Sequence, residues 1–239
     1  MSDRVSEEGD AMSTDVWAAV FLIAAPVWFN VAFAMLASRF DYPAVLREPA
    51  GAILERFRAG GDGLVWLWWA FAASALLLVP AVVLLSATAT DGGPLVAVAT
   101  VTGVLAALVQ LLGLLRWSYL VPWLARAHAG ASTPQERASF EVTFEAFHRF
   151  LGVGVGEHLG YLFTGLWTAA IGIAIALDGL VASWLGWIGL PVGLGLMFGS
   201  TEFLGSSWEG GWKLAGDAVP ILYVAWSLWL VALGIALVL

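Results

Sequence analysis

Six apolar stretches, each about as long as a bilayer is thick, constrain this chain more than any other feature. A helix that crosses the hydrocarbon core needs about 20 mostly apolar residues. Because backbone polar groups cannot stay unpaired in lipid, such stretches favour helices. We therefore predict an all-α, polytopic membrane helix bundle with six transmembrane helices. The predicted spans are Thr14–Ser38, Asp62–Ala87, Pro94–Leu115, Gly154–Leu177, Val181–Phe203 and Ala218–Leu239.

The composition indicates burial in lipid. Hydrophobic residues make up 61% of the 239-residue chain and charged residues 12%, whereas soluble domains carry about 25% charged residues. The 14 Trp are typical of a bilayer interface. The net charge of −8 argues against nucleic acid as a partner. The lack of Cys excludes disulfides and thiol chemistry. Few lysines and many acids favour a salt-adapted prokaryote, with a GC-rich bacterial genome as the alternative.

The ends and the connections complete the predicted organisation. Residues 1–13 form an expected disordered acidic tail with no basic signal-peptide region, and residues 14–239 form a single transmembrane domain. Two connections, Tyr42–Gly60 and Ser132–Arg149, mix apolar and charged residues and predict two cytoplasmic amphipathic helices. The fifth span, Val181–Phe203, contains several glycines and is expected to be irregular, packed between neighbouring helices.

The basic residues predict an orientation in the cell membrane. Nine of the ten lie in the connections between spans one and two, three and four, and five and six. The positive-inside rule places these connections in the cytoplasm and both termini outside.

The sequence Gly152–Tyr161 contains the clearest candidate site. Glu157 and His158 are ionisable groups within a predicted span, where such groups are costly and often functional. Gly152, Gly156 and Gly160 recur every four residues, a spacing that lets another helix approach closely. The pair Glu157–His158 could hold a proton or a polar ligand. Alternatively, Glu157 pairs with an arginine and His158 caps a helix or reaches the membrane surface.

Arg116, at the end of the third span, is the natural partner of Glu157. A structural Arg116–Glu157 bridge would fix helix register more than it would stabilise the bundle. Supporting polar or aromatic candidates are Asn30, Gln110, Tyr119, Thr164 and Trp167.

Metal and haem sites are not expected. Glu145 and His148 have an i, i+3 spacing used in di-iron bundles, but no second such motif exists. His148 and His158 are ten residues apart on one predicted helix, and His128 lies in a predicted loop, which disfavours axial haem ligation. No cofactor is therefore predicted.

Three blocks of the sequence resemble a known family. The central block runs from Gly152 to Thr168, the second from Leu115 to Arg126, and the first from Tyr42 to Gly61. Together they resemble a prokaryotic membrane-protein family catalogued as domain of unknown function 4386. The resemblance spans about Trp17 to Leu237. It implies a fold of six or seven helices without an assigned activity, and it draws attention to Arg116, Glu157 and His158.

Three classes of function are compatible with the sequence. The first is a non-enzymatic membrane subunit, sensor or membrane-adaptation protein, embedded in the lipid bilayer and able to form a homo-oligomer or bind another membrane protein. The second is a small proton-linked transporter that uses the Glu157–His158 pair, although no repeated halves are evident. The third is an intramembrane enzyme or cofactor protein, which would need more polar groups in one pocket. The first is preferred.

Overall fold

The chain folds almost entirely into helices. The computed structural model describes residues 14–89, 93–204 and 211–239, together with the backbone of residues 2–13. No strand occurs within these ranges. The elements are α1 (Ser2–Phe40), η1 (Ala44–Arg47), α2 (Ala50–Thr88), α3 (Pro94–Tyr119), α4 (Val121–Gly130), α5 (Pro134–Phe147), the π-helix η2 (His148–Leu159), α6 (Gly160–Asp178), α7 (Ser183–Gly199) and α8 (Lys213–Ala236).

Five described helical segments are long and apolar enough to cross a membrane. They are Thr14–Phe40, Ala50–Thr88, Pro94–Gly130, Pro134–Asp178 and Lys213–Ala236. The all-helical, multi-pass architecture is thus confirmed. Helix α7, the predicted fifth span, is apolar but has only 17 residues, because it ends at Gly199 and turns follow it where the sequence predicted helix to Phe203.

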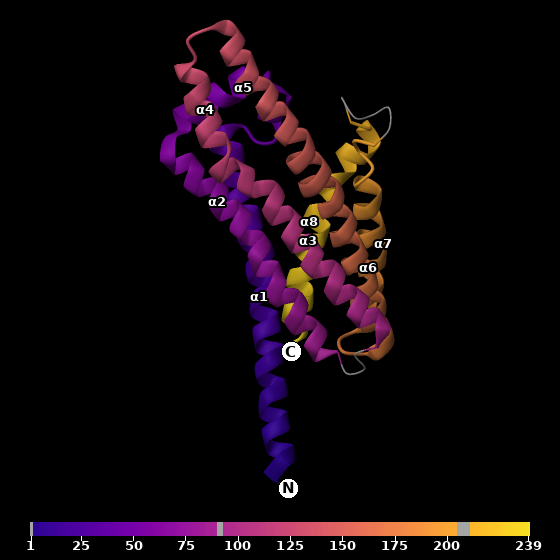
Figure 1. Cartoon of the computed structure of the whole chain (residues 1–239). Helices are drawn as coiled ribbons and strands as arrows, with labels where there is room; N and C mark the ends of the chain where they lie inside the picture. The colour runs from indigo at the N-terminus through magenta and orange to yellow at the C-terminus, as the bar shows by residue number, and fades with distance from the viewer. Residues whose placement is uncertain (1, 90–92, 205–210) are drawn as a thin grey trace.

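The helices form an elongated bundle whose two ends differ (Figure 1). Both chain termini lie toward one end, as do the C-terminal end of α2 and the N-terminal end of α7. The α4–α5 hairpin lies at the other end, together with the start of α2. Arg56 belongs to the first part of α2, Arg126 to α4 and Arg137 to α5, the elements that form this second, arginine-rich end.

Several predicted boundaries merge in the structure. The amphipathic segment predicted at Tyr42–Gly60 splits into η1 and the first part of α2, and α2 then continues into the second span. Gly61 has φ 59° and ψ −160°, so α2 bends there. A residue without Cβ adopts this conformation at low cost. Helix α1 begins at Ser2, whereas the sequence predicted an acidic tail over residues 1–13; the disorder of that tail stays a prediction.

The fourth span is one continuous element with the amphipathic helix that precedes it. Thr133 caps α5 by accepting a hydrogen bond from the backbone N–H of Glu136. The Glu136 carboxylate accepts in return from the N–H of Ser132, at 2.8 Å. From Pro134 the chain remains helical through α5, η2 and α6.

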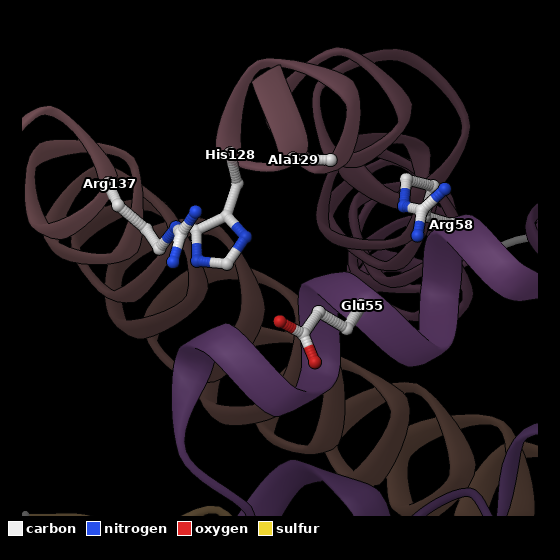
Figure 2. Close-up of a pocket in the computed structure, with 5 residues that line it drawn as sticks. All are labelled: Glu55, Arg58, His128, Ala129 and Arg137. Atoms are coloured by element: carbon white, nitrogen blue, oxygen red, sulfur yellow. The ribbon is translucent and has the colours of Figure 1, made fainter. Parts of the chain in front are cut away.

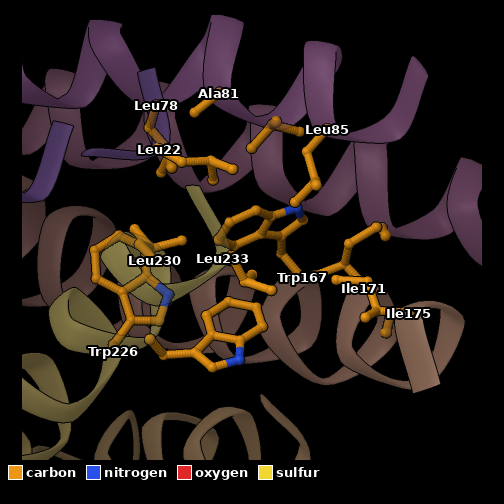
Figure 3. Packing of buried hydrophobic residues seen from close by; sticks show 14 of the residues in the cluster. Leu22, Leu78, Ala81, Leu85, Trp167, Ile171, Ile175, Trp226, Leu230 and Leu233 are labelled. Carbon is orange, nitrogen blue, oxygen red and sulfur yellow. The ribbon is translucent and has the colours of Figure 1, made fainter. Parts of the chain in front are cut away.

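The main apolar core lies between α1, α2, α3, α6, α7 and α8. Trp167 is fully buried at its centre and contacts the rings of Trp226 and Trp229 (Figure 3). Helices α6 and α7 pack backbone to backbone: a Cβ added to Gly165 would lie 2.5 Å from the carbonyl oxygen of Gly193. The glycines that weaken α7 as an isolated helix therefore allow this close packing.

A second core lies toward the arginine-rich end. Its centre is a stack of Trp68 on Trp117, with ring centroids 4.4 Å apart and planes inclined by 10°. Phe40 packs edge-on against both Trp rings, and the Phe57 ring stacks on Trp117. This aromatic core fixes α1, α2 and α3 next to Arg116, which directly precedes Trp117.

Candidate functional site

The predicted site lies on an unusual helix. Residues His148–Leu159 form a π-helix of 12 residues, which continues α5 and leads into α6. π-Helical turns are rare and occur frequently at functional sites. The segment contains Glu157, His158 and two of the three glycines that the sequence singles out.

Those glycines form a face that contacts α3. A Cβ on Gly156 would lie 3.2 Å from the Cα of Gly113, and one on Gly160 would lie 2.9 Å from Cγ of Gln110. A Cβ on Gly152 would lie 2.5 Å from Nη2 of Arg116. The missing side chains thus let η2 touch the α3 backbone and leave space for a guanidinium.

Arg116 is buried, with 7% of its surface exposed, and its guanidinium points toward η2. Nη2 donates to Nδ1 of His148 at 3.1 Å, and Nη1 donates to the carbonyl oxygen of Gly113. Its carbon Cζ lies 5.3 Å from the centre of the Trp117 ring, a cation–π distance. Arg116 therefore uses Nη2 on His148 and Nη1 on the α3 backbone, whereas its buried Nε has no hydrogen-bond partner among the described residues.

The predicted Arg116–Glu157 bridge is absent from the ion pairs of the described residues. The Glu157 carboxylate makes neither a hydrogen bond nor an ion pair with any residue that the structure describes, although it lies within electrostatic range of Arg116. Glu157 is only partly exposed. A carboxylate in such a place is costly when charged and unpaired.

Three tyrosines lie within electrostatic range of this carboxylate. The Glu157 charge acts on the hydroxyls of Tyr42, Tyr161 and Tyr223, which come from three separate elements of the chain. The rings of Tyr161 and Tyr223 are 5.4 Å apart, in an edge-on arrangement. We call Tyr42, Arg116, Glu157, Tyr161 and Tyr223 the Glu157 cluster. It offers three hydroxyl groups that can donate to or accept from a ligand of the carboxylate.

Tyr42 reaches the cluster from the turn after α1. Asp41 has φ 59°, and the Tyr42–Pro43 peptide is cis. The Tyr42 ring packs edge-on against Trp68, with 5.1 Å between ring centres. Burial raises the pKa of Tyr42 above its ordinary value, and the charge of Glu157 raises it further. Tyr42 therefore remains protonated and keeps its donor proton.

Glu202 lies at the edge of the cluster, after α7. It sits against the start of α8, where a Cβ on Gly216 would lie 2.5 Å from Oε1 of Glu202. The positive end of a helix dipole favours a carboxylate there. Burial nevertheless raises the pKa of Glu202, while Arg47 lowers it and Asp217 raises it.

His158 has a different role from Glu157. Its Nδ1 lies 2.7 Å from the carbonyl oxygen of Ser200, the residue that ends α7. The last carbonyls of a helix lack partners within the helix, so Nδ1–H of His158 supplies one. This contact fixes η2 to α7. His158 and Glu157 therefore do not share a neighbour, since His158 binds the end of α7 and Glu157 does not.

Polar groups continue from the cluster toward the middle of the bundle. Gln110 donates to Oγ1 of the fully buried Thr164 at 3.1 Å. Gln110, Tyr223 and Ser74 line a small cavity of about 20 Å³, which is enough space for one water molecule.

The remaining predicted candidates lie elsewhere. Asn30 donates to Oγ of Ser227 at 3.0 Å and so connects α1 to α8. Tyr119 is 70% exposed on the outside of the bundle, and Trp167 is fully buried in the apolar core. Neither contributes to the Glu157 cluster.

The histidines each have a defined contact. His128 lies in helix α4, where the sequence predicted a loop, and its Nε2 is 2.8 Å from Oε1 of Glu141. His148 contacts Arg116, and His158 contacts Ser200. Among the described residues, no group of three or more His, Asp or Glu is arranged to hold a metal ion.

The sequence did not identify four residues as part of the site, namely Tyr42, Tyr161, Tyr223 and Glu202. One signal was available: the chain has four Tyr, and three of them lie in the cluster. Tyr42 and Tyr161 also fall within two of the blocks that resemble the family. Nothing in the sequence, however, places α8 and its Tyr223 beside η2.

The apolar bundle, with polar groups enclosed between its helices, defines a multi-pass integral membrane protein. The family model for domain of unknown function 4386 matches residues 17–234. The chain belongs to this family. No curated protein and no solved structure matches it.

Proposed function

We propose that this chain is a non-enzymatic membrane subunit, sensor or membrane-adaptation protein that responds to a proton or a small cation at Glu157. The observation that carries this proposal is the Glu157 carboxylate, which is partly buried in a π-helix and lacks a hydrogen-bond or ion-pair partner among the described residues. A carboxylate in this environment needs a neutralising proton or cation.

The proposed arrangement has six spans, with α7 as the fifth, in the cell membrane. The arginine-rich end faces the cytoplasm and both termini lie outside, since positive residues concentrate in cytoplasmic connections. Figure 1 supports an even number of crossings, because both termini lie toward the same end of the bundle. Lipid covers the outward-facing apolar side chains, and a second copy or another membrane protein is an expected partner.

The Glu157 cluster would act as a polar site open to exchange. Tyr161 and Tyr223 can donate hydrogen bonds to a charged carboxylate and accept them from a protonated one. Arg116 lies within electrostatic range of the carboxylate but forms no ion pair with it. Binding of a proton or cation would therefore alter the electrostatic interaction of η2 with α8 and with the turn that carries Tyr42.

Infrared difference spectroscopy of the full chain in detergent tests this proposal. Wild-type protein taken from high to low pH is expected to gain a protonated-carboxyl band that Glu157→Gln lacks. Glu145→Gln, which removes an exposed carboxylate from α5, is the matched control and should keep the band. Identical difference spectra for wild type and Glu157→Gln would overturn the proposal.

A second function, proton-linked transport, is favoured by one specific observation. Tyr223, a member of the cluster, lines the water-sized cavity inside the bundle together with Gln110, which donates to Thr164. Proteoliposomes that contain a pH-sensitive dye would reveal a proton flux. A flux that disappears in Glu157→Gln and persists in Glu145→Gln would support transport over sensing.

A further inference from the structure

A second polar site lies at the arginine-rich end, away from the Glu157 cluster. It is a cavity of about 220 Å³ lined by Glu55, Arg58, His128, Ala129 and Arg137. These residues come from α2, α4 and α5 (Figure 2). In the view of Figure 2, Arg137 and Arg58 lie on opposite sides of His128 and Glu55.

The wall of the cavity is built where three helices meet. Nε2 of His128 on α4 lies 2.8 Å from Oε1 of Glu141 on α5. Gly51 of α2 packs directly on this pair, since a Cβ there would lie 2.7 Å from the same Oε1. His128 is only 2% exposed. The contact among the three helices holds the cavity in shape.

The cavity presents two arginines without partners. Arg58 and Arg137 are exposed, and neither forms an ion pair or a hydrogen bond with the residues that the structure describes. Glu55 is the one acidic residue of the lining, and its carboxylate would repel an anion bound in the cavity. The two guanidinium groups outnumber this one carboxylate of the lining, and the Glu141 carboxylate next to the lining is engaged by His128.

The depth of the cavity matches the headgroup layer of a membrane. Trp123 on α4 is 52% exposed and lies five residues before His128. Exposed Trp side chains mark the bilayer interface. Five helical residues rise by about 7.5 Å, so a bilayer whose interface meets Trp123 would bring lipid phosphates within reach of the cavity.

We infer that this cavity binds a phosphate-bearing anion, with Arg58 and Arg137 as its ligands. Guanidinium groups match phosphate oxygens through paired N–H donors. The two sources of this chemistry are an anionic phospholipid headgroup and free phosphate. This inference is independent of the proposal for Glu157, since the two sites share no residue.

Calorimetric titration of the full chain in detergent tests the inference. The probes are short-chain phosphatidic acid, inorganic phosphate and, as a zwitterionic comparison, short-chain phosphatidylcholine. Wild type is expected to bind phosphatidic acid more tightly than phosphatidylcholine. Each arginine is worth about fivefold in affinity, so Arg58→Gln/Arg137→Gln should weaken binding about 25-fold.

Two further variants make the test specific. Arg126→Gln removes the same charge from an exposed position of α4 outside the cavity, and should leave binding unchanged. Glu55→Gln should strengthen it, and this gain does not depend on how well the double arginine variant folds. Tight binding of inorganic phosphate alone would assign the site to a free ion, and tight binding of the lipid alone to a headgroup. Binding of neither probe, or equal losses in Arg126→Gln and the double variant, would overturn the inference.

Discussion

Nη2 of Arg116 donates a hydrogen bond to Nδ1 of His148 across 3.1 Å, and Glu157 forms no ion pair with any residue that the structure describes. A guanidinium group has only donors, so Nδ1 of His148 must accept. The imidazole is therefore neutral and carries its proton on Nε2. The buried positive charge of Arg116 is held by neutral groups, and the nearby carboxylate remains available.

This arrangement predicts unequal costs for two substitutions. His148→Ala leaves a donor of the buried Arg116 unpaired and should lower the free energy of unfolding by about 1–3 kcal/mol. Glu157→Gln should cost much less, since no ion pair is broken. Thermal unfolding in detergent measures both. A larger loss for Glu157→Gln than for His148→Ala would show that the carboxylate has a structural partner.

The contact between α3 and η2 predicts a steric effect at one glycine. In Gly113→Ala the new Cβ would lie 2.6 Å from the Cα of Gly156, and such overpacking costs about 1–3 kcal/mol. Gly154→Ala is the control. Gly154 lies on η2, as Gly156 does, but its Cβ would meet only the carbonyl oxygen of Arg149, at 3.6 Å. Comparable melting temperatures for both variants would contradict the close contact.

Glu202 predicts a pH dependence of stability. Its pKa is raised above the ordinary value of 4.5 because burial disfavours the charged form. The folded state therefore holds the proton more tightly than the unfolded state. This contribution to stability is complete below pH 4.5 and is lost as the pH rises through the raised pKa.

Glu202→Gln should accordingly lose less stability than wild type between about pH 4 and pH 8. The difference should be modest because the carboxylate is half-exposed and partly screened by solvent. Unfolding at several pH values measures it, with Glu145→Gln as an exposed control. A steeper decline in Glu202→Gln than in wild type would reverse the assigned sign.

The contact between His158 and Ser200 predicts a local effect. In His158→Phe the last carbonyl of α7 loses its donor, a loss of about 0.5–1.5 kcal/mol. Hydrogen exchange should accelerate near residues 196–200, while α3 keeps its protection. Uniform acceleration across the whole chain would instead indicate global destabilisation.

The proposed orientation predicts a labelling pattern. The chain contains no Cys, so single cysteines can be introduced without background. In intact cells, a membrane-impermeant thiol reagent should label Ser183→Cys, at the exposed start of α7, and leave Arg56→Cys unlabelled. After the cells are opened, both should react. Labelling of Arg56→Cys in intact cells would invert the orientation.

The helical class could be predicted from the sequence because hydrophobic length alone determines it. Glu157 could also be selected, since a charge within an apolar span is costly wherever its side chain points. Its surroundings could not be predicted. Matching depth along two helices suggested Arg116 as the partner, but depth does not determine the direction of a side chain around the helix axis.

The π-helix is one physical reason for that difference. Its wider turn changes the rotation per residue between Gly152 and Glu157, and the sequence pattern does not reveal it. Tyr42 and Tyr223 lie far from Glu157 along the chain, and only the packing of α1 and α8 places them nearby. The short α7 was harder to delimit because its glycines pair with those of α6.

The bend at Gly61 also has a consequence for how deeply the protein sits in a bilayer. On one side of Gly61, α2 carries Arg56 and Arg58; on the other it carries the exposed Trp66 and Trp69. Charged groups are most stable in water and Trp is most stable at the interface. The two sides of the bend therefore resist movement of α2 along the membrane normal in opposite directions. An alanine inserted after Gly61 would rotate the side chains of Trp66 and Trp69 about the helix axis and away from the bilayer interface. The bend at Gly61 thus fixes how deeply α2 sits in the bilayer, although this residue has no side chain.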